Sequence, residues 1–116
     1  MLSRLIGRQK EQDAKAWLKR QGIKIIAENF ICRGGELDLI GLEKETLVCF
    51  EVRYRKNTHH GSAAESITAQ KLMRLQRCFL HFIQRHPQYR HHALRMDALV
   101  FEGSHTTPRW IRNITG

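Results

Sequence analysis

Cysteine is scarce in this 116-residue sequence, and its placement argues against the common metal and disulfide frameworks. The only three are Cys32, Cys49 and Cys78, and no C-x-x-C motif is present. An odd, widely spaced set argues against a zinc knuckle and against a disulfide framework. Reduced thiols are the default for such a chain, so we expect free cysteines and a cytoplasmic protein.

Long apolar runs are also missing. No stretch approaches the roughly 20 apolar residues that a transmembrane helix needs. The apolar residues near the N-terminus soon give way to polar and charged ones, so we expect no signal peptide. The hydrophobic content of 41% is that of an ordinary globular protein, and no internal repeat divides the chain. We therefore expect one domain, residues 1–116, with a single core.

Acidic residues are few. The chain has 11 Asp and Glu against 20 Lys and Arg, which gives a formal net charge of +9. Residues 57–116 carry eight of these Lys and Arg and only three acids. Such a charge points to a polyanionic partner, most simply nucleic acid, and we expect DNA in preference to RNA. An anionic membrane surface and a charge that serves only solubility are the alternatives, and we expect no membrane partner.

The pattern of apolar residues predicts an α/β fold, a mixed central β-sheet flanked by helices in the order α-β-β-β-α-β-β. Helices are expected at residues 5–21 and 68–86, and strands at 23–30, 36–42, 46–55, 93–101 and 110–114. Thr68 is expected to cap the N-terminus of the second helix, and Pro87 follows its end. The polar segment 56–67 is expected to be a mobile loop near the end of the third strand.

The predicted hairpin of the second and third strands carries acids where half-buried strands prefer neutral residues. Pairing symmetrical about the 44–45 bond places Asp38 opposite Glu51, and Glu36 opposite Arg53, with Cβ atoms about 5 Å apart. Like charges so placed repel, and a cation between them is the usual reason to hold them together. A different register, or an exposed face screened by water, would remove the repulsion without a cation.

A further acid, Glu11, falls on the core-facing stripe of the first helix, together with Gly7, Ala14 and Leu18. A carboxylate at such a position is costly unless something pairs with it. Two interpretations are equally supported. Either Glu11 belongs to the acid site, or it lies at the rim of the stripe and reaches water.

The second helix carries a basic stripe beside its apolar one, formed by Lys71, Arg74, Arg77, His81 and Arg85. We expect Lys71, Arg74, Arg77 and Arg85 to bind nucleic acid. A solvated helix face is the usual explanation for such a run of charge. Here no acid between residues 66 and 96 offsets the stripe, which favours a surface that binds the phosphates of a nucleic acid.

Carboxylates on such a hairpin suit Mg²⁺ or Mn²⁺, because these hard cations prefer oxygen ligands. We expect Asp38, Glu51 and the Val52 carbonyl to supply ligands. A metal there would lower the pKa of a bound water and neutralise charge on a phosphate. Arg53, on the same strand face as Glu51, would contact the attacking water or the phosphate.

Two motifs give the sequence a family resemblance: Gly-Gly-Glu-Leu-Asp-Leu-Ile at 34–40 and Val-Cys-Phe-Glu-Val-Arg at 48–53. They resemble the YraN family of bacteria, which is related to Holliday-junction resolvases and to the PD-(D/E)xK nuclease superfamily. The similarity covers most of the chain. It implies a resolvase-like core, an acid set of Glu11, Asp38 and Glu51, and Arg53 in the position of the superfamily's catalytic lysine. Resolvase-like proteins often dimerise, so a homodimer is one expected state.

The arginine at position 53 divides the functional hypotheses. An arginine stays charged and cannot act as a general base, although it can hold a phosphate. The first hypothesis is a metal-dependent endonuclease acting on DNA, with Lys71 as a substitute amine if its helix faces the site. The second is a non-catalytic nucleic-acid-binding protein with a relict site. A small module that binds an acidic protein ranks third.

Overall fold

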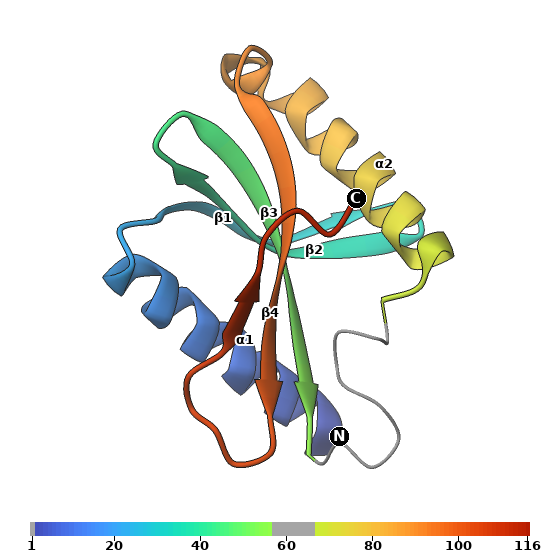
Figure 1. The fold of residues 1–116 in the computed structure, drawn as a ribbon. Helices are drawn as coiled ribbons and strands as arrows, with labels where there is room; N and C mark the ends of the chain where they lie inside the picture. The colour runs from blue at the N-terminus through green and yellow to red at the C-terminus, as the bar shows by residue number, and fades with distance from the viewer. Residues whose placement is uncertain (1, 57–66) are drawn as a thin grey trace.

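The computed structural model describes residues 2–56 and 67–116 (Figure 1). Its elements are α1 (Leu2–Arg20), β1 (Lys24–Cys32), β2 (Gly35–Glu43), β3 (Thr46–Arg55), α2 (Ala69–Arg85), the 3₁₀ turn η2 (Pro87–Tyr89), β4 (Ala93–Glu102) and β5 (Arg109–Ile111). The predicted order is confirmed, and the Thr68 side chain caps α2 by accepting from the Lys71 N–H. The expected mobile loop falls almost entirely outside the described residues. No helix in the described part of the chain is long and apolar enough to cross a membrane.

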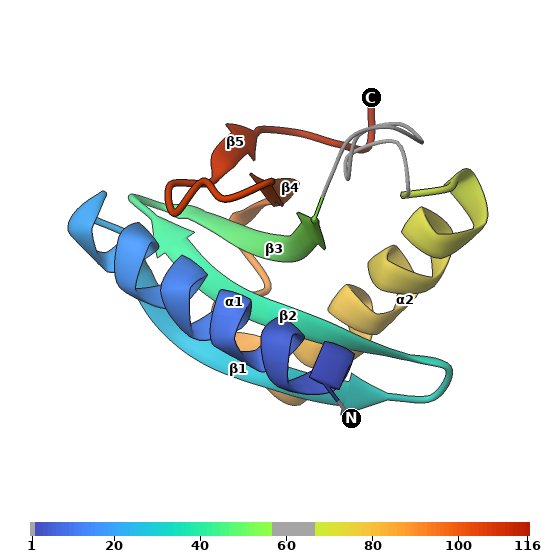
Figure 2. The same cartoon turned by 90° about the horizontal axis from the view of Figure 1, so that it is seen from below.

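The five strands form one mixed sheet in the order β1-β2-β3-β4-β5. Neighbouring strands are antiparallel except β3 and β4, which are parallel and are connected through α2. α1 and α2 cover opposite faces (Figure 2). Alternate residues of β3 pack into two clusters: Val48 and Phe50 against α1, Leu47 and Cys49 against α2. The α/β fold with a sheet between helices is therefore confirmed.

The predicted hairpin register is confirmed between β2 and β3, but only for half of the hairpin. The pairs run from Glu43 opposite Thr46 to Leu39 opposite Phe50, and there the ladder ends. Beyond this point β2 continues with β1 alone and diverges from β3 (Figure 1). Two-stranded ribbons twist more than wide sheets, which gives β2 a different course from β3. The expected pair of Glu36 and Arg53 is therefore wrong.

Two of the three cysteines are joined. Cys32, at the end of β1, forms a disulfide with Cys78 of α2, with 5.8 Å between the Cα atoms. Cys49 is free and buried in β3. The expectation of three reduced thiols is thus wrong for two of them. The bond joins positions 46 residues apart, and only the packing of α2 on the β1–β2 ribbon brings them within reach.

Asp97 of β4 is fully buried and is surrounded by donors. Arg95 donates to both of its carboxylate oxygens, at 2.9 and 2.8 Å. The Trp110 indole N–H of β5 and the Asn113 backbone N–H donate to it at 2.8 and 2.9 Å. β5 ends earlier than predicted, and Asn113 beyond it adopts a left-handed φ of 56°. One carboxylate therefore holds the C-terminal segment against the sheet.

Replacing Asp97 with Ala should lower the free energy of unfolding by about 2–4 kcal/mol, because the N–H donors of Trp110 and Asn113 lose their acceptor and Arg95 keeps Glu43 as its partner. Urea unfolding followed by circular dichroism measures the difference. Glu102→Gln is the matched control, since its partner Arg109 is largely exposed, and should cost less than about 1 kcal/mol. Equal losses in the two variants would contradict this role for Asp97.

Candidate functional site

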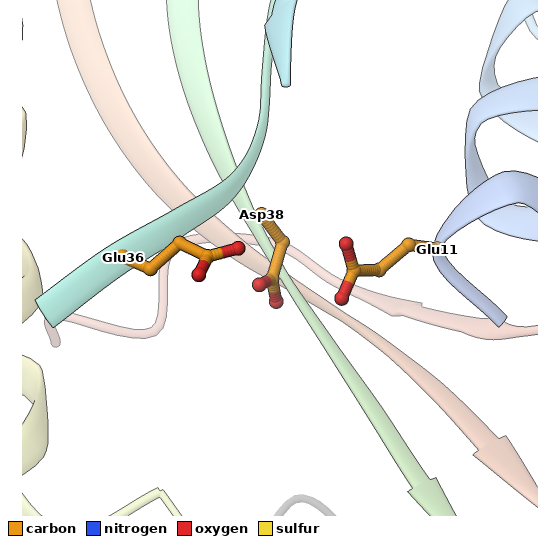
Figure 3. A group of neighbouring side chains, drawn as sticks. All are labelled: Glu11, Glu36 and Asp38. Atoms are coloured by element: carbon orange, nitrogen blue, oxygen red, sulfur yellow. The ribbon is translucent and has the colours of Figure 1, made fainter. Parts of the chain in front are cut away.

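Four acids gather where β2 parts from β3. Glu11 comes from α1, Glu36 and Asp38 from β2, and Glu51 from β3. Carboxylate oxygens of Glu11, Glu36 and Asp38 all lie within 4.8 Å of one another. Figure 3 shows Asp38 between the other two, with the three carboxylates turned toward one another. Two of the predicted acids, Glu11 and Asp38, are therefore brought together with Glu36, and Glu51 lines the same hollows as Glu11 and Asp38.

The divergence of the two strands also explains how Asp38 is fixed. Past the end of the ladder, the backbone N–H of Val52 has no carbonyl partner on β2. The Asp38 carboxylate takes that place and accepts the Val52 N–H at 2.9 Å. A side chain thus closes the gap that the missing ladder leaves, and this holds Asp38 beside Glu51 on the neighbouring strand.

Glu51 is the most deeply placed of the four acids, with 6% of its surface exposed. Burial raises its pKa to about 8, and the charge and hydrogen bond of Asp38 add to the shift, while Arg53 and Lys71 oppose it. Arg53 Nε lies 3.8 Å from a Glu51 oxygen, beyond hydrogen-bond range. Within the described residues, Arg53 Nε and Nη2 are buried without a hydrogen-bond partner. The buried carboxylate is therefore poorly compensated by protein groups.

Glu11 lies beside the acids of β2 and is partly exposed. Burial raises its pKa to about 7, and the negative charges of Asp38 and Glu36 raise it further. With its amide nitrogen turned toward the acids, Asn29 donates to Glu11 at 2.7 Å and to Glu36 at 2.8 Å. Asn29 has a left-handed φ of 54° in β1. Nothing in the sequence pattern had pointed to this residue.

Two hollows meet at these acids, and Glu11, Asp38 and Glu51 line both. One, of about 350 Å³, is bordered by the β1–β2 turn and by the start of α2; its remaining lining residues are Gly34, Gly35, Glu36, Lys71, Arg74 and Leu75. The other, of about 310 Å³, lies toward α1 and the end of β3 and includes Lys10, Val52, Arg53 and Arg55. Each hollow therefore places cationic side chains next to the shared acids.

The basic stripe of α2 divides into residues that border the site and residues that do not. Lys71 precedes the buried residues Leu75, Cys78 and Phe82 at helical spacing, so it continues the stripe that packs on the sheet. Lys71 and Arg74 line the 350 Å³ hollow. Arg77 and Arg85 are exposed, and the residues lining this hollow do not include them. Two of the four predicted phosphate-binding residues are thus adjacent to the acids.

Lys10 is another lysine near the acids, and its ammonium group contacts two aromatic rings. Its Nζ lies 5.2 Å from the centre of the Tyr54 ring and 5.0 Å from that of Phe101. Such cation–π contacts hold an ammonium group over the aromatic faces. Lys71 lines the hollow on the α2 side together with the acids.

The chain belongs to the uncharacterised protein family UPF0102, which matches residues 10–101. It is 43% identical over 110 residues to a UPF0102 protein of Alcanivorax borkumensis, covering 92% of this chain and 88% of that protein. A UPF0102 protein of Aeromonas hydrophila is 42% identical over 108 residues, covering 92% and 82%. One of Neisseria meningitidis is 42% identical over 106 residues, covering 91% and 90%. The matched region includes all four acids and the α2 cations.

The raised pKa of Glu51 predicts a pH dependence of stability in protein kept free of metal by a chelator. Between pH 4.5 and 8 the folded state holds a proton that the unfolded state has released, so the free energy of unfolding falls as pH rises. Glu51→Gln is neutral throughout and lacks this loss. From pH 5 to pH 8.5 the variant should gain on the order of 2–4 kcal/mol relative to wild type.

Urea unfolding at a series of pH values measures this gain. Glu45→Gln, at an exposed turn position, is the control and should run parallel to wild type. A constant difference between Glu51→Gln and wild type at all pH values would mean that the buried carboxylate does not retain its proton.

Proposed function

We propose that this protein is an endonuclease-like hydrolase of DNA phosphodiester bonds that depends on Mg²⁺ or Mn²⁺. One observation carries the proposal: acids from three separate elements, Glu11, Asp38 and Glu51, converge beside Arg53 and Lys71. No packing need explains such a convergence of like charges, whereas metal-assisted phosphoryl chemistry requires it. The net charge of +9 and the resemblance of the two motifs to the YraN family and its nuclease relatives support the same function.

The chemistry of the donor set fits such a metal. The candidate ligands are the carboxylates of Asp38 and Glu51, which line the same two hollows, with the Val52 carbonyl. Carboxylate oxygens of Glu11 and Glu36 lie within 4.8 Å of Asp38 and add further donors. Glu51 is buried and poorly compensated, which is the environment in which a divalent cation favours the ionised carboxylate. When bound, Mg²⁺ or Mn²⁺ supplies Lewis acidity, which lowers the pKa of a water ligand and neutralises charge on the phosphate.

The cationic residues have distinct tasks in this proposal. Lys71 and Arg74 hold the phosphate in the hollow on the α2 side, where they face the acids. Arg53 lies next to Glu51, and two of its buried nitrogens have no acceptor among residues 2–56 and 67–116, so it stabilises negative charge that develops on the phosphate. It does not accept a proton, because a guanidinium remains charged. Lys71 is the amine in a position to assist the attacking water.

Cleavage of DNA is the direct test. Branched, single-stranded and duplex DNA are incubated with purified protein and Mg²⁺ or Mn²⁺. We expect cleavage of at least one substrate, and a loss of about 100-fold or more in Asp38→Asn and Glu51→Gln, which keep the size of each side chain but remove its charge. Glu45→Gln should behave as wild type. An inactive wild type, or variants that cleave as well as it does, would contradict the proposal.

A second candidate function is favoured by Arg53, which stands where the nuclease resemblance expects lysine. The protein would then bind nucleic acid without cleaving it, and Arg53→Lys would introduce cleavage that wild type lacks.

For either function, Lys71→Ala and Arg74→Ala should weaken binding of an oligonucleotide in Ca²⁺. Each change should also flatten the salt dependence of binding by about one unit of slope.

Fluorescence anisotropy at several salt concentrations measures this effect. Arg85→Ala, on the same helix but away from the acids, is the matched control and should change affinity less. Equal effects at positions 71, 74 and 85 would indicate a diffuse basic surface in place of a site centred on the acids.

A further inference from the structure

We propose that Cys32 and Cys78 form a redox-modification site, whose exchange with a dithiol controls how firmly the two walls of the acid hollow are held together. Cys32 is the last residue of β1 and pairs with Gly35, so it stands at the base of the turn that leads into Glu36 of β2. Cys78 lies seven residues after Lys71, which is two turns further along the same face of α2. The disulfide joins these two positions directly.

The two segments that the bond connects are the two walls of the 350 Å³ hollow. Gly34, Gly35 and Glu36 form one wall, and Lys71, Arg74 and Leu75 form the other. The disulfide is the covalent connection between the wall with the acid and the wall with the cations. Whether the disulfide is oxidised or reduced therefore affects the distance between the phosphate-binding residues and the acids.

The β1–β2 ribbon depends on this connection more than the rest of the sheet does. The part of β2 that precedes Leu39 is not paired with β3, so within the described residues the backbone ladder at the tip of the ribbon runs between β1 and β2 alone. Non-covalent contact with α2 remains through Phe30, whose ring packs edge-on against Phe82 at 5.2 Å, and through buried Leu37. Reduction should loosen the tip and leave the fold intact.

A dithiol is the reductant in this exchange. Cys32 is partly exposed, whereas Cys78 is 1% exposed, so the thiolate of the dithiol attacks Cys32 Sγ. The Cys32–Cys78 bond breaks, and Cys78 leaves as a thiolate that takes up a proton. The second thiol of the dithiol then attacks the mixed disulfide, which frees Cys32 and closes the dithiol into its own disulfide. Two electrons and two protons pass to the protein.

The structure accommodates the reduced state. Cys32 Sγ lies 3.5 Å from the Gly35 carbonyl oxygen, so a reduced thiol has an acceptor in place. The third cysteine, Cys49, is buried in β3, and burial raises its pKa well above the ordinary range. It is therefore a poor participant in exchange, and the reaction concerns one defined pair.

The test compares wild-type protein oxidised with diamide and reduced with dithiothreitol. Thiol titration in denaturant should find one thiol after oxidation and three after reduction. Hydrogen exchange should be about 10-fold faster or more in the reduced form at residues 33–37 and 69–75, and unchanged in β3 and β4. Three thiols after oxidation, or the same exchange rates in both forms, would overturn the proposal.

The consequence for DNA rests on the proposed function and is measured separately. Reduction should weaken binding of a labelled oligonucleotide in Ca²⁺ by about three-fold or more, because the cations and acids are less pre-organised. A Cys32→Ser, Cys78→Ser double variant should bind like reduced wild type in both conditions, and Cys49→Ala should respond as wild type does. Equal affinity of the two wild-type forms would overturn control of binding. No binding by either form would contradict the proposed function, while thiol counts and hydrogen exchange would still decide the redox site.

Discussion

Beyond Leu39 and Phe50 the backbone ladder between β2 and β3 ends, and the Val52 N–H passes to the carboxylate of Asp38. The candidate site depends on this replacement of a backbone acceptor on β2 by the Asp38 carboxylate. It fixes Asp38 beside Glu51, and it separates the β1–β2 ribbon from β3. The opening that results is lined by α1 on one side and by the start of α2 on the other.

The electrostatics of the opening follow from that geometry. Glu51 is buried next to a second carboxylate, while its arginine neighbour is too far away for a hydrogen bond. The isolated protein relieves this strain by retaining a proton, as the pKa of about 8 indicates. A divalent cation would relieve it differently, by compensating both charges at once. Burial therefore favours the protonated form of Glu51, whereas a bound divalent cation would favour its ionised form.

Much of the fold followed from the sequence, because apolar periodicity and turn residues act locally. The order of elements and the register of the hairpin as far as Leu39 and Phe50 were predicted. Extending that register led to the expectation that Asp38 faces Glu51, whereas the ladder ends before this pair and Asp38 accepts from the Val52 N–H. The position of Glu36 was not predicted, because the alternation of side chains along β2 does not indicate where β3 stops pairing with it. Asn29 and the donors that Trp110 and Asn113 direct at Asp97 were missed for a related reason, as each contact joins segments that are distant in the sequence. The disulfide was excluded from cysteine spacing, which carries no information about how α2 packs.

The function attributed to this member of UPF0102 depends on whether the parted strands hold a divalent cation. The most direct measurement is anomalous diffraction from crystals soaked in Mn²⁺, collected for wild type and for Asp38→Asn. The account predicts an anomalous peak between Asp38 and Glu51 in wild type that is lost in the variant. A peak elsewhere, a peak that persists in Asp38→Asn, or no peak at saturating Mn²⁺ would contradict it.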